Sequence, residues 1–492
     1  MSIRPGLSAL ALAVALAGCA GVSAPSAPDQ PWTPSALPLS APDRPWAVPA
    51  IPLPDPAPAP AGLDARKPLD LVALIDIAQR ANPLTRQAWT AARQAALGVG
   101  LADAAFLPML SASVLAGSQK TRIPLRDNLL GIDHLDTRSQ GTVPLVALTW
   151  LLFDFGQRRA LREGAEQLSF AANVLFNASH QKVIRDVTDQ YYQYTTARQR
   201  VEWSARSLAL QRQVLAAAQA RYRAGTGTTV DVALARQAVA QARLQVVNSR
   251  GLEKTTRLAL LGALGLAPDT ELTIAAPAHR PLPAETPALT RDALRQALSQ
   301  RPDIVAQYAA AQAEEAQVRA AQAAFMPKIY LGAAYAHQNR HLQAGSLPDV
   351  GMQATSSGVM LGVTVPLYDG GLRRNRLESA RLSARQARDD LQSLQQAALR
   401  EMAAADAALQ SALQSHAAAH ELVQTAQTAS QAALAAYKAG MGTITLATEA
   451  ANQLLLARLA RLDARTAAQI AAANLAFATG AMVRPRSQWL AQ

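Results

Sequence analysis

Two stretches of the chain have the apolar spacing of very long helices. Residues 157–222 and 372–437 run without proline, and Gly164 is their one glycine. At a rise of 1.5 Å per residue, each would form a helix of roughly 100 Å. In the second stretch apolar residues recur every three or four positions, at Leu377, Ala380, Ala384, Ala387, Leu391, Leu394, Ala398, Met402, Ala405 and Leu409. This spacing predicts a helix that packs against partners along its whole length.

Other segments alternate apolar residues with small or polar ones, at the period of two that strands have. The apolar positions are Leu110, Ala112, Val114, Ala116, Val146, Leu148, Trp150, Leu152, Ile329, Leu331, Ala333, Tyr335, Val359, Leu361, Val363 and Val365. Segments of about ten such residues fit a transmembrane β-barrel, although hairpins on a soluble domain would show the same pattern. Four strands cannot close a barrel, since small barrels need about eight. A barrel would therefore be built by several chains, because open strand edges are not tolerated in lipid.

The chain is internally duplicated. Asn82-Pro83 recurs as Arg301-Pro302, and the segment 104–108 recurs as 323–327, both at an offset of 219. Further pairs share an offset of 215: Phe153-Asp154-Phe155-Gly156 with Tyr368-Asp369-Gly370-Gly371, Arg158 with Arg373, Tyr222 with Tyr437, Gly225 with Gly440, Gly227 with Gly442, Thr228 with Thr443, and Gly265 with Gly480. So many matches at constant offsets indicate two copies of one structural unit.

The first copy is expected to occupy residues 69–268. It would begin with a helix and continue through a strand hairpin at about 109–153. A long helix at 157–222 would follow, and a tight turn would lead into a return helix at 228–264. Residues 269–289 would then connect the two copies.

The second copy is expected at residues 290–481, with the same order of elements. Its strand hairpin would lie at about 328–368, its long helix at 372–437 and its return helix at 443–479. Residues 482–492 would form a C-terminal tail. The long helices could also belong to a simple coiled-coil dimer, but the sharp interruptions at both ends argue against that alternative.

The N-terminus predicts export and lipid attachment. Arg4 and an apolar stretch at residues 7–17 form a secretory signal that is too short to span a membrane. It ends in Leu16-Ala17-Gly18-Cys19, which resembles a bacterial lipoprotein signal. Removal of a signal peptide at 1–18 would leave the chain's one cysteine, Cys19, as the attachment point for diacylglycerol and palmitate, which would anchor it in the outer membrane. The alternative is a free cysteine inside an uncleaved signal.

A proline-rich segment follows the predicted anchor and completes the leader at residues 19–68. Residues 24–68 hold 14 of the 29 prolines. Proline fixes φ and favours an extended, semi-rigid arm rather than a folded domain. Such an arm could run across the outside of the folded body, or it could be a disordered tether.

Composition and charge disfavour several classes of function. The net charge of +12 could suggest a nucleic-acid partner, but an exported protein does not meet nucleic acid. The arginines are spread along the long helices, as expected for solvated faces and helix–helix ion pairs. No catalytic motif is present, and His416 and His420, at helical i, i+4 spacing, lack a nearby third metal ligand. We therefore expect no enzymatic activity, no cofactor and no metal.

The order of elements, the duplication and three repeated signatures resemble the outer membrane factor (TolC-like) family. The signatures are Phe-x-Pro, aromatic-Asp-x-Gly and Tyr-x-x-Gly-x-Gly-Thr, and the resemblance covers roughly residues 69–481. The lipoprotein signal points to the branch that serves tripartite efflux pumps. The resemblance implies a mainly α fold with a transmembrane β-barrel, in which four strands from each chain of a homotrimer form twelve strands continued by a helical periplasmic tunnel. Its implied partners are an inner-membrane transporter, a periplasmic adaptor (membrane fusion) protein and outer-membrane lipid.

The resemblance also implies roles for the two helix-turn-helix tips, Tyr222 to Asp231 and Tyr437 to Glu449. Their turns would contact the adaptor through Gly225, Thr226, Gly227, Gly440, Met441 and Gly442. Tyr222, Asp231, Tyr437 and Glu449 would form a periplasmic gate, where relatives carry acidic residues just past the turn. Leu446 stands at one of these acidic positions, which implies a looser or less cation-selective gate. Asp231 and Glu449 could instead be ordinary acids of a first helical turn.

The resemblance favours a passive exit duct for small toxic molecules, antibiotics among them, that a pump expels. An outer membrane component of a type I protein secretion system is the main alternative, and the lipid anchor favours the pump. A structural lipoprotein that tethers the envelope would not need apolar strand faces. A soluble enzyme is disfavoured by the missing catalytic motifs.

Overall fold

The computed structural model describes residues 67–124, 134–277, 281–283, 290–344 and 348–483. The chain divides into two units, Met1–Asp55 and Pro56–Gln492, and every described residue belongs to the second. The predicted signal peptide, Cys19, nearly all of the proline-rich arm and residues 484–492 of the predicted tail lie outside the described residues.

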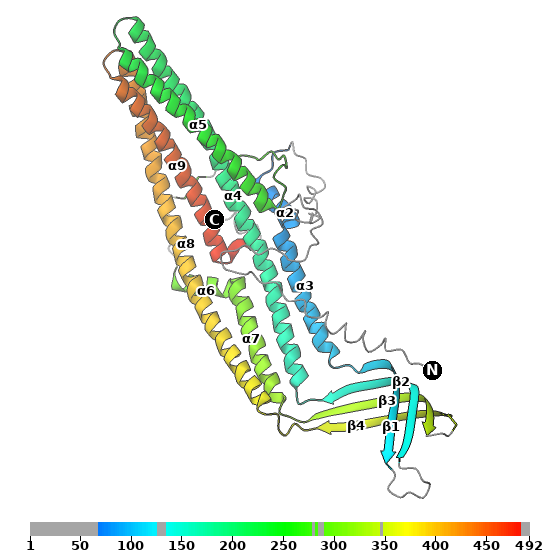
Figure 1. Cartoon of the computed structure of the whole chain (residues 1–492). Helices are drawn as coiled ribbons and strands as arrows, with labels where there is room; N and C mark the ends of the chain where they lie inside the picture. Colours follow the sequence, from blue (N-terminus) through cyan, green and yellow to red (C-terminus); the bar gives the residue numbers. More distant parts are fainter. Residues whose placement is uncertain (1–66, 125–133, 278–280, 284–289, 345–347, 484–492) are drawn as a thin grey trace. The chain divides into compact units, whose positions relative to one another are not determined.

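The described unit contains two copies of one series of elements (Figure 1). The first copy consists of α2 (Leu71–Ala81), α3 (Pro83–Ala104), β1 (Met109–Pro124), β2 (His134–Phe153), α4 (Gln157–Arg223) and α5 (Thr229–Leu264). The second copy consists of α6 (Arg291–Gln300), α7 (Pro302–Ala323), β3 (Lys328–Ala344), β4 (Val350–Thr364), α8 (Leu372–Lys438) and α9 (Ile444–Ala478), and a short 3₁₀ turn, η1 (Ala481–Val483), follows it. Within this unit the strands lie at one end and the α4–α5 and α8–α9 turns at the other.

Two helices precede each hairpin, where the sequence pattern predicts one. The break falls at Asn82-Pro83 in the first copy and at Arg301-Pro302 in the second. A residue before proline avoids the helical region, and proline itself fits the first helical position because it has no N–H to place. Asn82 adopts extended angles, and its side chain accepts a hydrogen bond from the N–H of Leu84 at 2.9 Å. The proline therefore starts a new helix in each copy.

The four strands form one antiparallel sheet in the order β1-β2-β3-β4. The register aligns the apolar positions of all four strands on one face of this sheet. Leu110 pairs with Leu148, Leu148 with Ala333, and Ala333 with Val359. The neighbouring row on the other face holds Ser111, Ala147, Ala334 and Gly358. The alternation predicted from sequence therefore forms one continuous apolar face.

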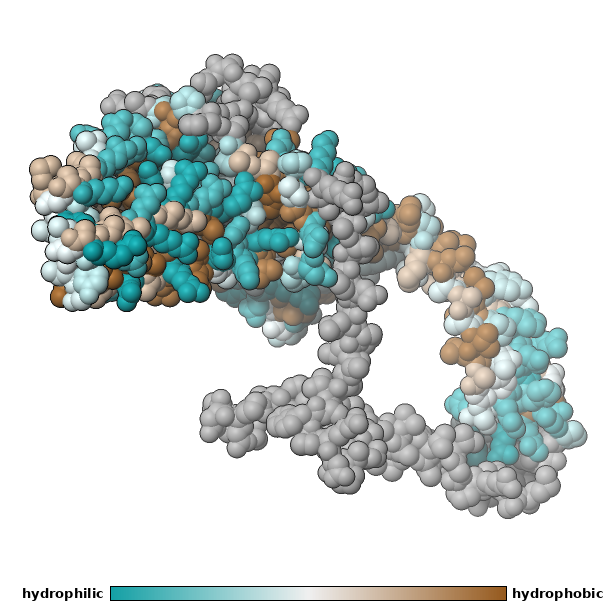
Figure 2. Space-filling model, turned by 90° about the horizontal axis from the view of Figure 1, so that it is seen from above, coloured by the Kyte–Doolittle hydropathy of each residue, from teal (hydrophilic) through white to brown (hydrophobic). Residues whose placement is uncertain are grey.

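The strands are 15 to 20 residues long, which exceeds the segments of about ten expected from the apolar alternation. The additional residues are polar and carry the strands beyond the apolar part, as with Lys120 and Arg122 on β1 and Arg340 on β3. Figure 2 shows this change along the faint curved extension that the sheet forms, with brown residues nearer the helices and teal ones farther out. None of the helices in the described part of the chain is apolar and long enough to cross a membrane.

Each hairpin joins its long helix through an Asp-Arg pair. In the first copy Arg158 bonds Asp154 at 3.0 Å, donates to the carbonyls of Ala105 and Leu151, and lies over the ring of Phe106. Arg373 and Asp369 form the equivalent pair at 2.5 Å in the second copy. The repeated aromatic-Asp-x-Gly signature therefore fixes the path of the chain from strand to helix.

The repeated glycine Gly265 lies at the end of the first return helix, α5, where the chain packs tightly against Asn82. Gly265, at φ +74°, ends α5, and a side chain there would come within 2.7 Å of the Cα of Asn82. The side chain of Asn82 donates to the carbonyl of Ala263 at 2.9 Å. The largest apolar cluster surrounds this point and joins α2, α4, α5 and the connector through Leu74, Val187, Tyr191, Leu260, Leu264 and Ile274. The connector also forms a parallel bridge, in which Leu69 pairs with Ile274.

Candidate functional site

The two helical tips reverse the chain with the same backbone geometry. Gly225 has φ +73° and Gly440 has φ +84°, a left-handed conformation that glycine adopts without strain. In the first tip the N–H of Gly225 bonds the carbonyl of Tyr222, and the N–H of Thr226 bonds that of Arg221, both at 3.0 Å. The second tip repeats both bonds. This pattern is the Schellman motif, which satisfies the last carbonyls of a helix.

The second glycine of each turn, Gly227 or Gly442, is needed because neighbouring backbone atoms leave no room for a side chain, and not because of its φ angle. A side chain at Gly227 would come within 3.0 Å of the backbone N of Tyr222. At Gly442 the same distance to the N of Tyr437 would be 3.1 Å. Backbone atoms cannot move away as a flexible side chain can, so both turns are tightly folded against the helices that precede them.

The two return helices begin with different caps. Thr228 accepts a hydrogen bond from the N–H of Asp231, and the Asp231 carboxylate accepts one from the N–H of Thr228, both at 3.1 Å. This capping box satisfies two N–H groups at the start of α5. In the second tip Thr443 caps the N–H of Leu446 at 3.3 Å, but Leu446 has no oxygen with which to reciprocate. Asp231 thus helps to cap α5, whereas Leu446, at the equivalent position of the second copy, cannot accept the corresponding hydrogen bond at the start of α9.

A cation–aromatic contact and a shared apolar cluster hold the two tips together. Arg221, at the end of α4, lies 4.8 Å from the centre of the Tyr437 ring, at the end of α8. Its guanidinium donates to the carbonyl of Tyr437 at 3.0 Å and to that of Thr226 at 3.2 Å. The cluster beneath this contact contains Val214, Ala218, Val232, Ala235, Tyr437, Ile444 and Ala447. The tips therefore form one packed unit.

The three predicted gate residues other than Asp231 have different surroundings. Tyr437 is 1% exposed, and burial together with the nearby Asp231 raises the pKa of its phenol. Tyr222 is 49% exposed, although it is the repeat counterpart of Tyr437. Glu449 is exposed and accepts a hydrogen bond from Gln453 at 2.6 Å. Among the predicted adaptor-contact residues, Met441 is the most prominent apolar side chain on the surface of the turns.

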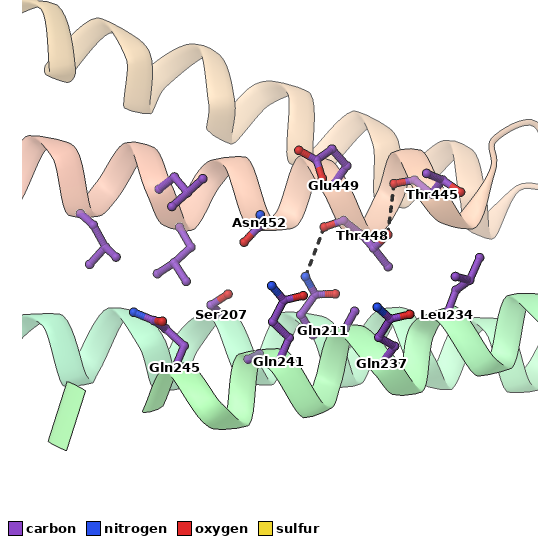
Figure 3. Close-up of a pocket in the computed structure, with 15 residues that line it drawn as sticks. Ser207, Gln211, Leu234, Gln237, Gln241, Gln245, Thr445, Thr448, Glu449 and Asn452 are labelled. Atoms are coloured by element: carbon purple, nitrogen blue, oxygen red, sulfur yellow. Dashed lines mark hydrogen bonds between the residues drawn. The ribbon is translucent and has the colours of Figure 1, made fainter. Parts of the chain in front are cut away.

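A polar groove lies beside the tips, between α4, α5 and α9 (Figure 3). Its volume is about 370 Å³, and eight of its fifteen lining residues carry amide or hydroxyl groups. The polar lining residues are Ser207, Gln211, Gln237, Gln241, Gln245, Thr445, Thr448, Glu449 and Asn452. Gln211 lies at its floor, where it donates to the carbonyl of Thr448 at 3.2 Å. Its side-chain oxygen is buried without a partner among the described residues.

Sequence reasoning missed Arg221 and the groove. The repeat offset places Ala436 at the position of Arg221, so the arginine breaks the symmetry that made the other tip residues visible. This difference between the two copies was the feature of the sequence that could have pointed to Arg221. The groove is assembled from three helices, and glutamines on a helix resemble an ordinary solvated face. Within the described residues, no group of three or more His, Cys, Asp or Glu side chains is arranged to hold a metal ion.

Comparison with known proteins identifies relatives along most of the chain. The family described as outer membrane efflux protein matches residues 74–266 and 293–481. Protein CyaE of Bordetella pertussis is 31% identical over 429 residues, which cover 85% of this chain and 86% of CyaE. Outer membrane efflux protein BepC of Brucella suis is 27% identical, with 78% and 79% covered. Outer membrane protein OprJ of Pseudomonas aeruginosa is 26% identical, with 84% of each chain covered.

Solved structures agree with the fold. The structure of CusC, a protein that undergoes transmembrane channel formation, superposes with a TM-score of 0.71 at 22% identity and covers 83% of this chain and 91% of CusC. The outer-membrane channel OprN superposes with a TM-score of 0.70 at 21% identity, with 84% and 91% covered. The four-stranded sheet, the long helices and their duplication are therefore a known channel architecture.

Proposed function

Because this chain belongs to the outer membrane efflux protein family, we propose that it is the passive exit duct of a tripartite efflux system. It would conduct small toxic molecules outward from an inner-membrane pump and a periplasmic adaptor. The family is one of outer membrane channels and not of enzymes. The observation that carries the proposal is the joining, in one unit, of an apolar-faced sheet to helices of 67 residues.

The proposed duct consists of three copies of the chain. The sheet of one copy ends in two open edges, β1 and β4, and open edges are costly in lipid. Joining β1 of one copy to β4 of the next would satisfy both edges, and three copies would give a closed barrel of twelve strands. The same symmetry would bring three pairs of helical hairpins together as a tunnel.

The tips are the proposed periplasmic gate and adaptor contact. Arg221 holds the ends of α4 and α8 together through Tyr437, so separating the two hairpins would break this contact. Tyr222, Asp231 and Glu449 remain at or near the surface of the tips, where symmetry would bring three copies of each together. The exposed turns at Gly225–Gly227 and Gly440–Gly442 supply the surface proposed for the adaptor.

The proposed membrane anchor is a lipid on Cys19, which follows the predicted signal peptide 1–18. Two or more acyl chains give stable anchoring, because each buried CH₂ contributes about 0.8 kcal/mol. The lipid and the barrel would then hold the same protein in the outer membrane.

The test is intracellular accumulation of a fluorescent dye and a panel of antibiotics, with and without the gene. We expect accumulation to rise on deletion and to return to the original level on complementation. The matched control is a complementing gene with Cys19→Ser, which separates lipid attachment from transport. Unchanged accumulation for every compound would contradict the proposal. If a particular secreted polypeptide were then trapped in the deletion strain, the type I secretion alternative would be favoured.

A further inference from the structure

A basic, aromatic pocket lies far from the strands, between α4, α8, α9 and the connector. Its volume is about 260 Å³. Trp203 comes from α4, His416 and His420 come from α8, and Arg458, Arg461 and Arg465 come from α9. Pro281 and Leu282 of the connector form an apolar part of its wall. The walls thus contain three guanidinium groups and two imidazoles, and none of the lining residues is acidic.

Some arginines on the helices form ion pairs with carboxylates. Arg200, nearby on α4, is paired with Asp463, and Arg388 on α8 is paired with Glu315. No carboxylate of the described residues lies within ion-pair distance of Arg458 or Arg461. Burial and the neighbouring Arg206 and Arg461 lower the pKa of Arg458. Positive groups therefore repel one another in a partly buried place, at an energetic cost that a bound anion would offset.

Trp203 contacts one arginine of the pocket, Arg458, and one arginine outside its lining, Arg206. The guanidinium of Arg458 lies 4.5 Å from the centre of the Trp203 rings, and that of Arg206 lies 4.6 Å from it. Contact with the aromatic ring restricts the motion of the Arg458 guanidinium, so less side-chain entropy is lost when an anion binds. His416 and His420 project from α8 into the same pocket and can add charge when protonated.

We propose that this pocket binds a small anion that carries at least two negative charges on phosphate or carboxylate groups. Guanidinium groups match both chemistries, since their paired N–H donors fit two oxygens of one anionic group. The pocket volume admits a molecule of the size of pyrophosphate or citrate, and Leu282 and Pro281 would shield one side of it from water. The site is separate from the tips and does not depend on which molecules the duct conducts.

The test is isothermal titration of the full-length, detergent-solubilised protein with pyrophosphate and with citrate, at constant ionic strength. The variants are Arg461→Gln and Arg458→Gln. The matched control is Arg212→Gln, because Arg212 is exposed on α4 and does not line the pocket. We expect the two pocket variants to weaken binding about tenfold or more and the control to leave it unchanged. Tighter binding of pyrophosphate would assign the site to phosphates, and tighter binding of citrate would assign it to carboxylates.

Two outcomes would overturn the proposal. One is the absence of saturable binding of either anion to the native protein at millimolar concentration. The other is an equal loss in Arg212→Gln, which would show attraction to the overall positive charge and not to a site. Arg461→Lys distinguishes loss of the site from misfolding, because lysine keeps the positive charge but lacks the paired N–H donors of arginine. We expect this variant to melt like the native protein and to bind with intermediate affinity.

Discussion

At the scale of single residues, the joint between the sheet and the long helices depends on one ion pair in each copy. The Asp154 side chain is 6% exposed, and its counterpart Asp369 is 27% exposed. Removing one partner of a buried pair leaves the other charge uncompensated. We predict that Arg158→Ala destabilises the protein by about 3–5 kcal/mol in denaturant unfolding, and that Arg373→Ala has a clearly smaller effect. Equal losses would contradict the prediction, since they would mean that burial does not set the cost.

Asp189, on α4, is a half-buried carboxyl with a measurable consequence. Burial, together with the neighbouring Asp186, raises its pKa to about 6, and its Oδ1 atom is buried without a partner among the described residues. Above this pKa the folded state holds an unfavourable charge that the unfolded state solvates. Between that pKa and the ordinary value near 3.8, the folded state alone binds the proton, so stability rises as pH falls through this window.

We therefore predict that Asp189→Asn stabilises the protein by about 1–2 kcal/mol at neutral pH and removes this rise of stability on acidification. Thermal melts between pH values of roughly 4 and 8 measure both effects. Asp186→Asn is the comparison, because it keeps the Asp189 carboxyl: the rise of stability on acidification should remain but become smaller, since Asp186 contributes to the raised pKa of Asp189. A native protein whose stability does not change across this range would refute the argument.

At the scale of elements, the different caps of the two return helices give a test of the gate. Leu446→Asp would complete a capping box with Thr443, as Asp231 does with Thr228. We predict slower hydrogen exchange at the start of α9, equivalent to about 0.5–1 kcal/mol. If these positions also line the proposed pore constriction, the added carboxylates should increase block of channel current by divalent cations in planar bilayers.

Asp231→Leu is the reciprocal variant, and it should speed exchange at the start of α5 and reduce the block by cations. A change in exchange without any change in block would leave both residues as helix caps and would remove Asp231 from the proposed gate. The two readouts therefore distinguish a structural acid from an acid of the pore.

Two histidines, His416 and His420, line the basic pocket, and their titration makes the proposed anion site sensitive to pH. Burial, followed by Arg465, His420 and Arg461, lowers the pKa of His416. The imidazole of His416 shares the pocket with Arg458, Arg461 and Arg465 of α9, His420 of α8, and Trp203 of α4. The positive groups among these neighbours disfavour the charged form of His416 while the pocket is empty. A bound anion reverses that preference, so binding takes up protons.

We predict that sulfate, whose charge is constant in this range, binds about three- to tenfold more tightly at a pH of roughly 5.5 than at roughly 8. The double variant His416→Gln/His420→Gln should bind with the same affinity at both values. Titration calorimetry measures the effect, and proton uptake follows from repeating it in buffers of different ionisation enthalpy. An affinity that rises with pH would contradict the assignment of these imidazoles to the site.

The elements differ in how far the sequence could predict them. The absence of proline indicated the long helices, and the observed α4 ends one residue beyond the expected position, at Arg223. The break between α2 and α3 was missed because Asn82 caps a helix only when Pro83 starts one. The strands are longer than expected because alternation marks only the apolar part, and polar strand ends resemble loops. The basic pocket could not be predicted, since Trp203 and Arg461 are brought together only by packing of α4 against α9.

At the scale of the whole molecule, the sheet has one continuous apolar face and two open edges, β1 and β4. Leu361 pairs with Leu331, and Leu331 pairs with Trp150, so a row of large apolar side chains crosses the sheet. Met360, one position away, points to the opposite face, and the two side chains are similarly exposed in one chain, at 68% and 70%. If three copies close a barrel in the outer membrane, Leu361 faces lipid and Met360 faces the lumen.

We therefore predict that Leu361→Arg abolishes the closed barrel and that Met360→Arg preserves it. An arginine on the lipid face of a membrane barrel costs up to about 2–4 kcal/mol, depending on its depth, and the cost applies in each copy. Migration of membrane-extracted protein without heating measures the assembly, since a closed barrel should run as a heat-sensitive trimer. Equal loss in both variants would show that neither face is distinguished by lipid. A native protein that runs only at monomer mass would rule out the trimeric barrel itself. The two arginine variants differ by one position along β4, so their comparison isolates the side of the sheet as the cause.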